Sequence, residues 1–199
     1  TVVVGLDTEP NTFDPHLTTG RASESFMSNV FDGLTLHDQD GALVPGLATS
    51  WEALDDYTWQ FNLREGVSFH NGEPFNAEAV KFTLDRVLEP DRNATIAPLL
   101  QNITEVEIVD DFTVIIHIAD PDLLLPARLA ELYGSIMPPQ YVEENGDEYI
   151  ALNPIGTGPF IFEEWVIDDH ITLTANPDYW GGAPAVDQIF LLVERCRSI

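Results

Sequence analysis

Basic residues are scarce in this sequence. Its 199 residues include 8 Lys and Arg against 34 Asp and Glu, which gives a formal net charge of -26 and a sequence pI of about 4.1. Lys81 is the single lysine. Nucleic-acid phosphates and anionic lipid surfaces are bound by clustered Lys and Arg side chains. The composition therefore argues against nucleic acid and against an anionic membrane surface as partners.

Cysteine and long apolar runs are also lacking. Cys196 is the single cysteine, which excludes an internal disulfide framework and a multi-cysteine metal site. The longest apolar runs, such as residues 123–125 and 190–193, fall far short of the roughly 18 residues that a membrane-spanning helix needs. The printed chain starts at Thr1 without an initiator Met, so we expect that its natural N-terminus was processed or trimmed away.

Recognisable catalytic patterns are missing as well. The histidines are scattered and form no H-x-x-x-H or H-E-x-x-H spacing, and no G-x-S-x-G nucleophile elbow occurs. Asp pairs recur, but no D-x-D-x-D-G string predicts a calcium loop. We therefore expect no catalytic residue, no metal and no cofactor, and a protein that is not an enzyme; an enzyme would need a convergent nucleophile and base that the sequence does not reveal.

The apolar residues that are present suffice for a folded core. Hydrophobic residues make up 44% and aromatic residues 10% of the chain. Helical spacing and end signals predict four helices, and alternating or β-branched runs predict five strands, the first of them buried. Asp pairs at 55–56, 110–111 and 168–169 each separate two strand-like runs and predict hairpin turns. The expected helices are 22–31, one capped by Asn76, 123–132 and 139–145, and the expected strands are 2–6, 58–63, 113–118, 160–166 and 171–175.

Eight short strings, taken together and in order, are more specific than any of these features. They are NTFDP (11–15), VFDGL (30–34), LVPGLA (43–48), SWE (50–52), FNLREGV (61–67), FHNGEPFNAEAV (69–80), NPIGTGPF (153–160) and NPDYW (176–180). In this order the chain resembles the family 5 extracellular solute-binding proteins, the oligopeptide, dipeptide and nickel receptors of ABC importers. The resemblance extends from Thr1 to about residue 193.

The resemblance implies a mixed α/β (α+β) fold that forms part of lobe I of a two-lobed, peptide-binding clamshell. Residues 1–193 would be the N-terminal part of that lobe, with lobe II absent, and residues 194–199 an atypical tail that we expect to be truncated or out of frame. It further implies capture of peptides or a related solute at the extracellular face of the cytoplasmic membrane, as a monomer that delivers its ligand to the transmembrane permease. Membrane association would come only through a lipid anchor upstream of Thr1. The alternative is a nonfunctional remnant, or a single-lobe interaction module without transport activity.

The resemblance also suggests which residues contact a ligand. The loop before the first helix would offer hydroxyl or backbone groups, and its arginine would either meet a carboxylate or remain an exposed charge. A tyrosine after residue 132 would face the cleft or pack in the core. The glycine-rich loop would line the cleft or serve only the architecture. The candidate ligand-binding residues are Thr18, Thr19, Gly20, Arg21, Tyr133, Gly156, Thr157 and Gly158.

The glycine-rich loop does not have the features of a phosphate-binding loop. It lacks a third glycine and a G-K-[ST] ending, and Pro159 removes one of the N–H groups that would face an anion. Glycine instead permits a sharp turn and the close approach of another group before the next strand begins.

The dispersed acidic residues generate the first prediction, since they indicate a protein of a halophile, and we expect a halophilic archaeon. At molar salt the Debye length falls to about 3 Å, so repulsion among the carboxylates is screened. We expect the midpoint of thermal unfolding to rise from low to molar KCl. A midpoint that does not change with KCl concentration contradicts the interpretation.

Overall fold

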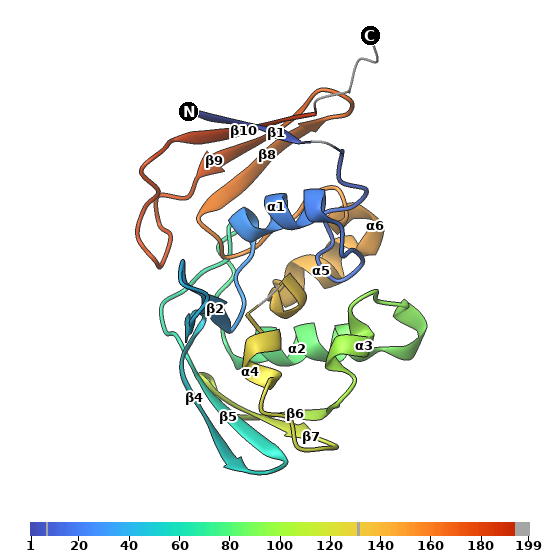
Figure 1. Cartoon of the computed structure of the whole chain (residues 1–199), viewed down its shortest axis with the longest axis vertical. Helices are drawn as coiled ribbons and strands as arrows, with labels where there is room; N and C mark the ends of the chain where they lie inside the picture. Colours follow the sequence, from blue (N-terminus) through green and yellow to red (C-terminus); the bar gives the residue numbers. More distant parts are fainter. Residues whose placement is uncertain (7, 131, 194–199) are drawn as a thin grey trace.

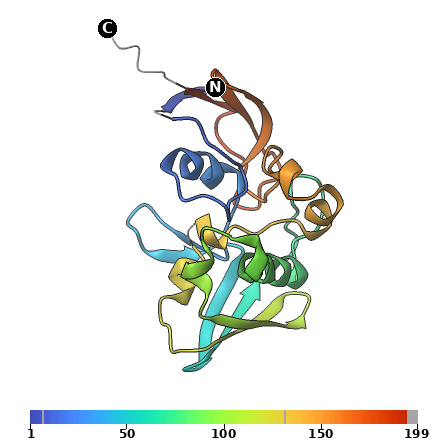
Figure 2. The ribbon, with the colours of Figure 1, turned by 90° about the vertical axis from the view of Figure 1, so that its right-hand side faces the viewer.

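Two four-stranded sheets lie at opposite ends of the long axis, with the longer helices between them (Figure 1). The computed structural model describes residues 1–6, 8–130 and 132–193. Figure 2 shows the same arrangement from the side, with the N-terminus and the end of β10 at the same end of the molecule. The expected mixed α/β fold is confirmed.

The first sheet has the strand order β1-β10-β9-β8 and the second the order β4-β5-β7-β6, while β2 and β3 form a separate ribbon. β1 pairs parallel to β10, and the other pairs are antiparallel. The strands are β1 (Val2–Leu6), β2 (Thr35–His37), β3 (Leu43–Pro45), β4 (Ala48–Asp55), β5 (Thr58–Leu63), β6 (Ile103–Asp110), β7 (Thr113–Ile118), β8 (Phe160–Val166), β9 (His170–Ala175) and β10 (Gln188–Val193). The helices are α1 (Arg21–Val30), α2 (Ala77–Leu88), α3 (Ala97–Leu100), α4 (Leu125–Arg128), α5 (Pro139–Asn145) and α6 (Asp147–Ile150), with short 3-10 turns η1 (Pro90–Arg92) and η2 (Leu132–Gly134).

The apolar spacing of the two longest helices is confirmed as core packing. Phe26 and Val30 of α1 are fully buried against the first sheet, and Val80 and Leu84 of α2 are fully buried against the second. α2 also begins as predicted, because the Asn76 side chain accepts a hydrogen bond from the backbone N–H of Ala79 at 3.2 Å. Each sheet thus has its own hydrophobic core, closed by one long helix.

The predicted Asp-pair hairpins are confirmed. Asp55 accepts a hydrogen bond from the backbone N–H of Tyr57 at 2.8 Å between β4 and β5. Asp110 accepts one from Phe112 at 2.9 Å between β6 and β7. Asp168, between β8 and β9, has a φ of 67°, in the left-handed region that Asp tolerates better than most residues. In two hairpins the side chain of the first aspartate closes the turn with a hydrogen bond. In the third, the positive φ of Asp168 turns the backbone.

Two expectations were wrong. The first strand forms but is not buried, since Val3 is 61% exposed, because β1 is an edge strand with a pairing partner on one side only. The helix expected at 123–132 is reduced to α4 and η2, and Leu123 is 84% exposed. Pro126 is tolerated only in the first turn of a helix, which prevents α4 from starting much earlier.

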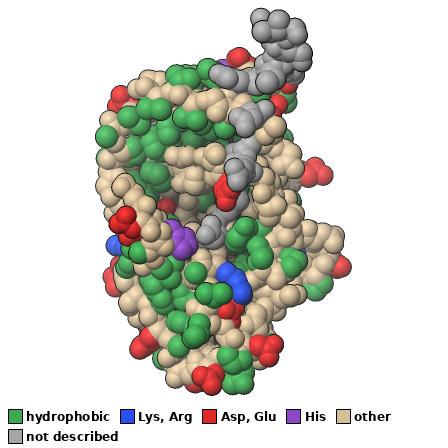
Figure 3. All heavy atoms as spheres, viewed as in Figure 1, with side chains coloured by type: hydrophobic (Ala, Val, Ile, Leu, Met, Phe, Trp, Pro, Cys, Tyr) green, Lys and Arg blue, Asp and Glu red, His purple; other side chains and the backbone are tan. Residues whose placement is uncertain are grey.

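Carboxylates are spread over the surface. On the face shown in Figure 3, Asp and Glu side chains are scattered and Lys and Arg are few. None of the helices in the described part of the chain is long and apolar enough to cross a bilayer.

The glycine-rich loop packs against the end of α1 and generates the second prediction. A Cβ added at Gly156 would lie 2.0 Å from the backbone oxygen of Val30, whereas one added at Gly20 meets nothing closer than 3.5 Å. We expect Gly156→Ala to lower the free energy of unfolding by about 2–3 kcal/mol, because backbone cannot yield as a side chain can. Gly20→Ala, the matched control, should cost under about 1 kcal/mol. Equal losses in denaturant titrations of the two variants contradict the packing described.

Candidate ligand-binding site

A cavity of about 410 Å³ lies along one face of α1. Glu24, Met27, Ser28 and Phe31 form this wall, because residues three and four apart lie on the same face of a helix. The remaining lining residues come from the segment after α1, from β2 and from three later segments: Asp32, Gly33, Leu36, His37, Ala130, Ser135, Pro159 and Tyr179. The cavity therefore joins parts of the chain that are far apart in sequence.

Asp32 is the buried charged group of this cavity. It is 4% exposed, and its carboxylate accepts hydrogen bonds from Thr157 Oγ1 at 2.9 Å, Trp180 Nε1 at 2.9 Å and Tyr179 OH at 3.2 Å. Burial raises the pKa of Asp32, and these hydrogen bonds oppose the rise. Burial, together with the charge of Asp32, also raises the pKa of Tyr179, so the phenol stays protonated and donates.

The glycine-rich loop holds this arrangement in place. The backbone oxygen of Gly158 lies 2.9 Å from His70 Nε2 and accepts from Asn176 Nδ2 at 3.1 Å, while the Gly158 N–H donates to Val30 at 2.9 Å. The backbone carbonyl of Gly156 accepts a hydrogen bond from the backbone N–H of His70 at 2.9 Å. Thr157 is 1% exposed and lies behind Asp32. The close approach expected of these glycines is confirmed. Thr157 is not among the residues that line the cavity, and its contact with a ligand stays a prediction.

The loop before α1 adjoins the Glu24 side of the cavity. The Gly20 carbonyl accepts the backbone N–H of Glu24 at 2.9 Å. Thr18 is buried and accepts from the Gly20 N–H at 3.2 Å, whereas Thr19 and Gly20 are exposed. Arg21 begins α1, but its side chain lies outside what the structure describes. Ligand contact at this loop stays a prediction.

Tyr133 lies beside the cavity rather than among its lining residues. It belongs to η2, between Ala130 and Ser135, and its half-buried ring packs against the core of the second sheet. The nearest lining residues, Ala130 and Ser135, are three and two positions away from it in sequence. Contact between Tyr133 and a ligand remains untested.

Sequence reasoning missed Glu24, Asp32, Ser135 and Tyr179. The signal was present for two of them, because Asp32 and Tyr179 lie in the VFDGL and NPDYW strings. Asp32 was interpreted only as part of a helix stop, since its partners at 157, 179 and 180 are more than a hundred residues away in sequence.

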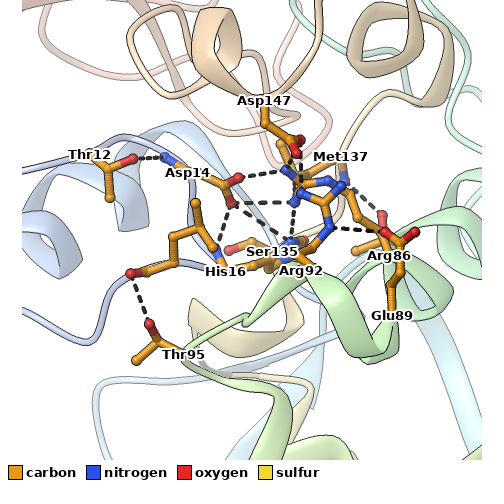
Figure 4. A network of polar contacts seen from close by, with 12 residues as sticks. Thr12, Asp14, His16, Arg86, Glu89, Arg92, Thr95, Ser135, Met137 and Asp147 are labelled. Carbon is orange, nitrogen blue, oxygen red and sulfur yellow. Dashed lines mark hydrogen bonds and ion pairs between the residues drawn. The ribbon is translucent and has the colours of Figure 1, made fainter.

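A buried charge network is connected to one residue of the cavity lining, Ser135 (Figure 4). Arg86 of α2 donates to Asp14 Oδ2 at 2.5 Å, to Asp147 Oδ1 at 2.9 Å and to His16 Nδ1 at 2.9 Å. His16 Nε2 lies 3.0 Å from the backbone oxygen of Ser135, which lines the cavity. The network thus ties the loop after β1, α2 and α6 to the cavity wall.

The contacts fix the protonation state of this network. Arg86 can only donate, so His16 Nδ1 accepts and Nε2 carries the proton that bonds Ser135. Burial lowers the pKa of His16 to about 4, and the attraction of Asp14 only partly opposes this. Burial alone would raise the pKa of Asp14, but the hydrogen bond and charge of Arg86 outweigh it and hold that pKa below its ordinary value. The network is therefore a neutral histidine beside an arginine–carboxylate pair.

Among residues 1–6, 8–130 and 132–193, no three His, Cys, Asp or Glu side chains are placed to hold a metal ion. The site as described offers hydrogen-bonding groups, one buried carboxylate and apolar walls.

Comparison with known proteins identifies the class to which this fold and cavity belong. The sequence model of the bacterial extracellular solute-binding proteins, family 5 Middle, matches residues 42–193. The chain belongs to this family of solute-binding proteins.

Individual relatives cover nearly the whole chain. It is 32% identical to di/tripeptide-binding protein 2 of Pseudomonas aeruginosa, over 97% of this chain and 41% of that protein. It is 34% identical to the glutathione-binding protein GsiB of Salmonella typhi, over 94% of this chain and 37% of that protein. This chain spans about two fifths of the length of such relatives.

Solved structures agree with the sequence matches. The oligopeptide-binding protein AppA of Bacillus subtilis, in complex with a nonapeptide, superposes with a TM-score of 0.91 at 28% identity, over 97% of this chain and 40% of that chain. AgaA of Agrobacterium tumefaciens, a periplasmic binding protein in complex with agropinic acid, superposes with a TM-score of 0.91 at 30% identity, over 97% of this chain and 39% of that chain. The expected part of a periplasmic-binding clamshell is thereby confirmed. The boundary at residue 193 stays a prediction, and residues 194–199 lie outside the described part.

The buried histidine generates the third prediction. Its folded pKa of about 4 lies below the ordinary 6.5, so the unfolded chain binds more protons between these values. The stability that neutral His16 contributes is complete above about pH 6.5 and is lost as the pH falls towards 4, at up to about 1.4 kcal/mol per pH unit. We expect the free energy of unfolding to fall less steeply over this window in His16→Gln, since Gln can still accept from Arg86 and donate to Ser135.

Denaturant titrations of both proteins from pH 7 to 4 measure this difference. The titrations of Asp32 and His70, whose pKa values burial also shifts, are common to both proteins and cancel when the profiles are subtracted. Parallel profiles contradict a neutral, buried His16.

Proposed function

We propose that this chain supplies one wall of the ligand cleft in the substrate-binding component of an ABC importer. Its ligand is a peptide or a related solute, captured outside the cell and passed to the permease subunits in the membrane. The protein acts as a monomeric binding protein, not as an enzyme, and touches the membrane itself only through a lipid anchor. The charge of -26 supports work at the high salt of a halophile's surroundings.

The observation that carries the proposal is the likeness of nearly the whole chain to peptide-bound relatives, together with a cavity along α1. The structure of AppA of Bacillus subtilis contains a bound nonapeptide, and it superposes on 97% of this chain. The 410 Å³ cavity is lined by hydroxyls, one buried carboxylate and apolar side chains. Ligand sites of proteins commonly combine apolar walls with a few placed polar groups. A side of α1 that faces such a cavity is suited to contact a ligand.

Titration of the chain with short peptides tests the proposal and is the fourth prediction. We expect di- to pentapeptides to cause saturable changes in the amide NMR shifts of residues lining the cavity and of Thr19 and Gly20. One wall alone should give a Kd on the order of 1 mM, because peptide groups facing away from it stay in water.

Two variants of one helix supply the matched comparison. Ser28 lines the cavity, whereas Ser25 is exposed on α1 outside it. Ser28→Trp should abolish the saturable shifts by filling the cavity, and Ser25→Trp should leave them unchanged. Absence of saturation, shifts confined to other surfaces, or equal effects of the two substitutions count against the proposed function and in favour of a remnant or an interaction module.

A further inference from the structure

The charge of the cavity points to a particular class of ligand. Glu24 is exposed at the cavity and Asp32 is buried in its wall. None of the described residues that line the cavity is Lys or Arg. A ligand that enters therefore meets net negative charge, from one group in water and one in a low-dielectric environment.

The described basic side chains are engaged elsewhere. Arg86 and Arg92 both contact Asp147, Arg128 pairs with Asp122, and Lys81 pairs with Asp85. These contacts pair the charges of the four basic side chains with carboxylates outside the cavity lining.

The fifth described basic side chain, Arg64, is linked to Asp32 through Trp180. Its guanidinium lies 4.3 Å from the ring centroid of Trp180, and its Nε donates to the Gly46 carbonyl at 3.1 Å. The indole of Trp180, in turn, donates to Asp32. Trp180 thus stands between the guanidinium of Arg64 and the carboxylate of Asp32. The described hydrogen-bond donors to that carboxylate are three neutral groups, while the charge of Arg64 acts on it through space and lowers its pKa slightly.

A buried carboxylate that has only neutral donors still attracts a cation strongly. Two opposite unit charges interact several times more strongly near a protein interior than in bulk water. Burial raises the pKa of Asp32, which indicates that its charge is incompletely compensated, and a cation in the cavity would lower that pKa again.

The rest of the lining suits an aliphatic stem. Met27, Phe31 and Leu36 are apolar, and the hydroxyls of Ser28, Ser135 and Tyr179 add oxygen atoms that can accept from an ammonium group. A volume of about 410 Å³ admits one long side chain but not a whole oligopeptide. Lysine-like side chains bury their methylene groups against apolar surface while the charged end seeks polar partners.

We propose that this cavity is a side-chain pocket for an aliphatic ammonium group, which makes lysine-bearing peptides the ligand class. That the ligand is a peptide rests on the proposed function. That the pocket binds an ammonium group does not. The stem lies along Leu36 and Phe31, and the ammonium group is held between Asp32 and Glu24.

A series of isosteric probes tests this pocket, as the fifth prediction. Ala-Lys-Ala is compared with Ala-norleucine-Ala, which keeps the aliphatic stem without the ammonium group, and with Ala-Glu-Ala. Butylammonium is compared with neutral 1-butanol, which has the same number of heavy atoms. Binding is followed by amide NMR shifts at the lowest KCl concentration at which the chain stays folded. We expect each ammonium probe to bind at least about tenfold more tightly than its neutral counterpart, since hydrogen bonds between charged groups are stronger than those between neutral groups.

Two variants test whether Asp32 and Glu24 cause the preference for ammonium probes. Asp32→Asn should remove most of the tenfold preference, and Glu24→Gln should reduce it about two- to fivefold, as expected of an exposed charge. Because Asp32→Asn can disturb folding, the exposed Glu24→Gln keeps the test decisive. Glu52→Gln, on exposed β4 outside the lining set, is the matched control and should change nothing.

The outcomes separate this inference from the proposed function. Equal binding of the lysine and norleucine peptides overturns the ammonium pocket while leaving peptide binding intact. Binding of butylammonium without binding of any peptide supports the pocket and overturns the proposed function. Failure of both ammonium probes to bind, or a preference unaffected by Glu24→Gln, overturns the pocket.

Discussion

The carboxylate of Asp32 is the point at which the separate parts of the cavity are joined. It follows α1 in the chain, yet its hydrogen-bond partners come from the glycine-rich loop and from residues 179 and 180. Its own backbone carbonyl accepts the N–H of Ile136 at 3.1 Å, which brings in the segment after η2. A buried carboxylate without such partners would be costly, so these segments must assemble together. The hydrogen bonds to this one carboxylate therefore hold several segments of the cavity wall together.

The Arg86 network likewise joins separate segments of the chain through buried polar groups. Arg86 and Asp14 are each at most 5% exposed, and they connect a helix of the second core with a loop of the first. Removing one partner of a buried ion pair leaves an uncompensated charge, which is why such pairs fix geometry even where their net contribution to stability is small. His16 extends the pair to the carbonyl of Ser135 and so to the cavity. The two hydrophobic cores are thus joined by these polar contacts, in addition to Phe82 of α2, which packs against the core of the first sheet.

Membership in the solute-binding family gives these contacts a functional setting. The chain covers about two fifths of its relatives, and within that part the fold is retained at a TM-score of 0.91 to AppA. The surface is strongly acidic while the basic groups of the described residues are engaged in pairs or in stacking.

The sequence alone determined the local structure. The spacing of Phe26 and Val30, the cap at Asn76 and the Asp-pair turns all depend on residues close in the chain, and the structure confirms them. The ordered strings also indicated the family, which the match over residues 42–193 shows. Only the tertiary structure decided that β1 is an exposed edge, that Thr157 lies behind Asp32 and that Glu24 and Asp32 share a cavity. The physical reason is that these features depend on segments more than a hundred positions away, namely β10 for β1, Asp32 for Thr157 and residues 135–179 for the cavity, and such contacts leave no periodic trace in either segment.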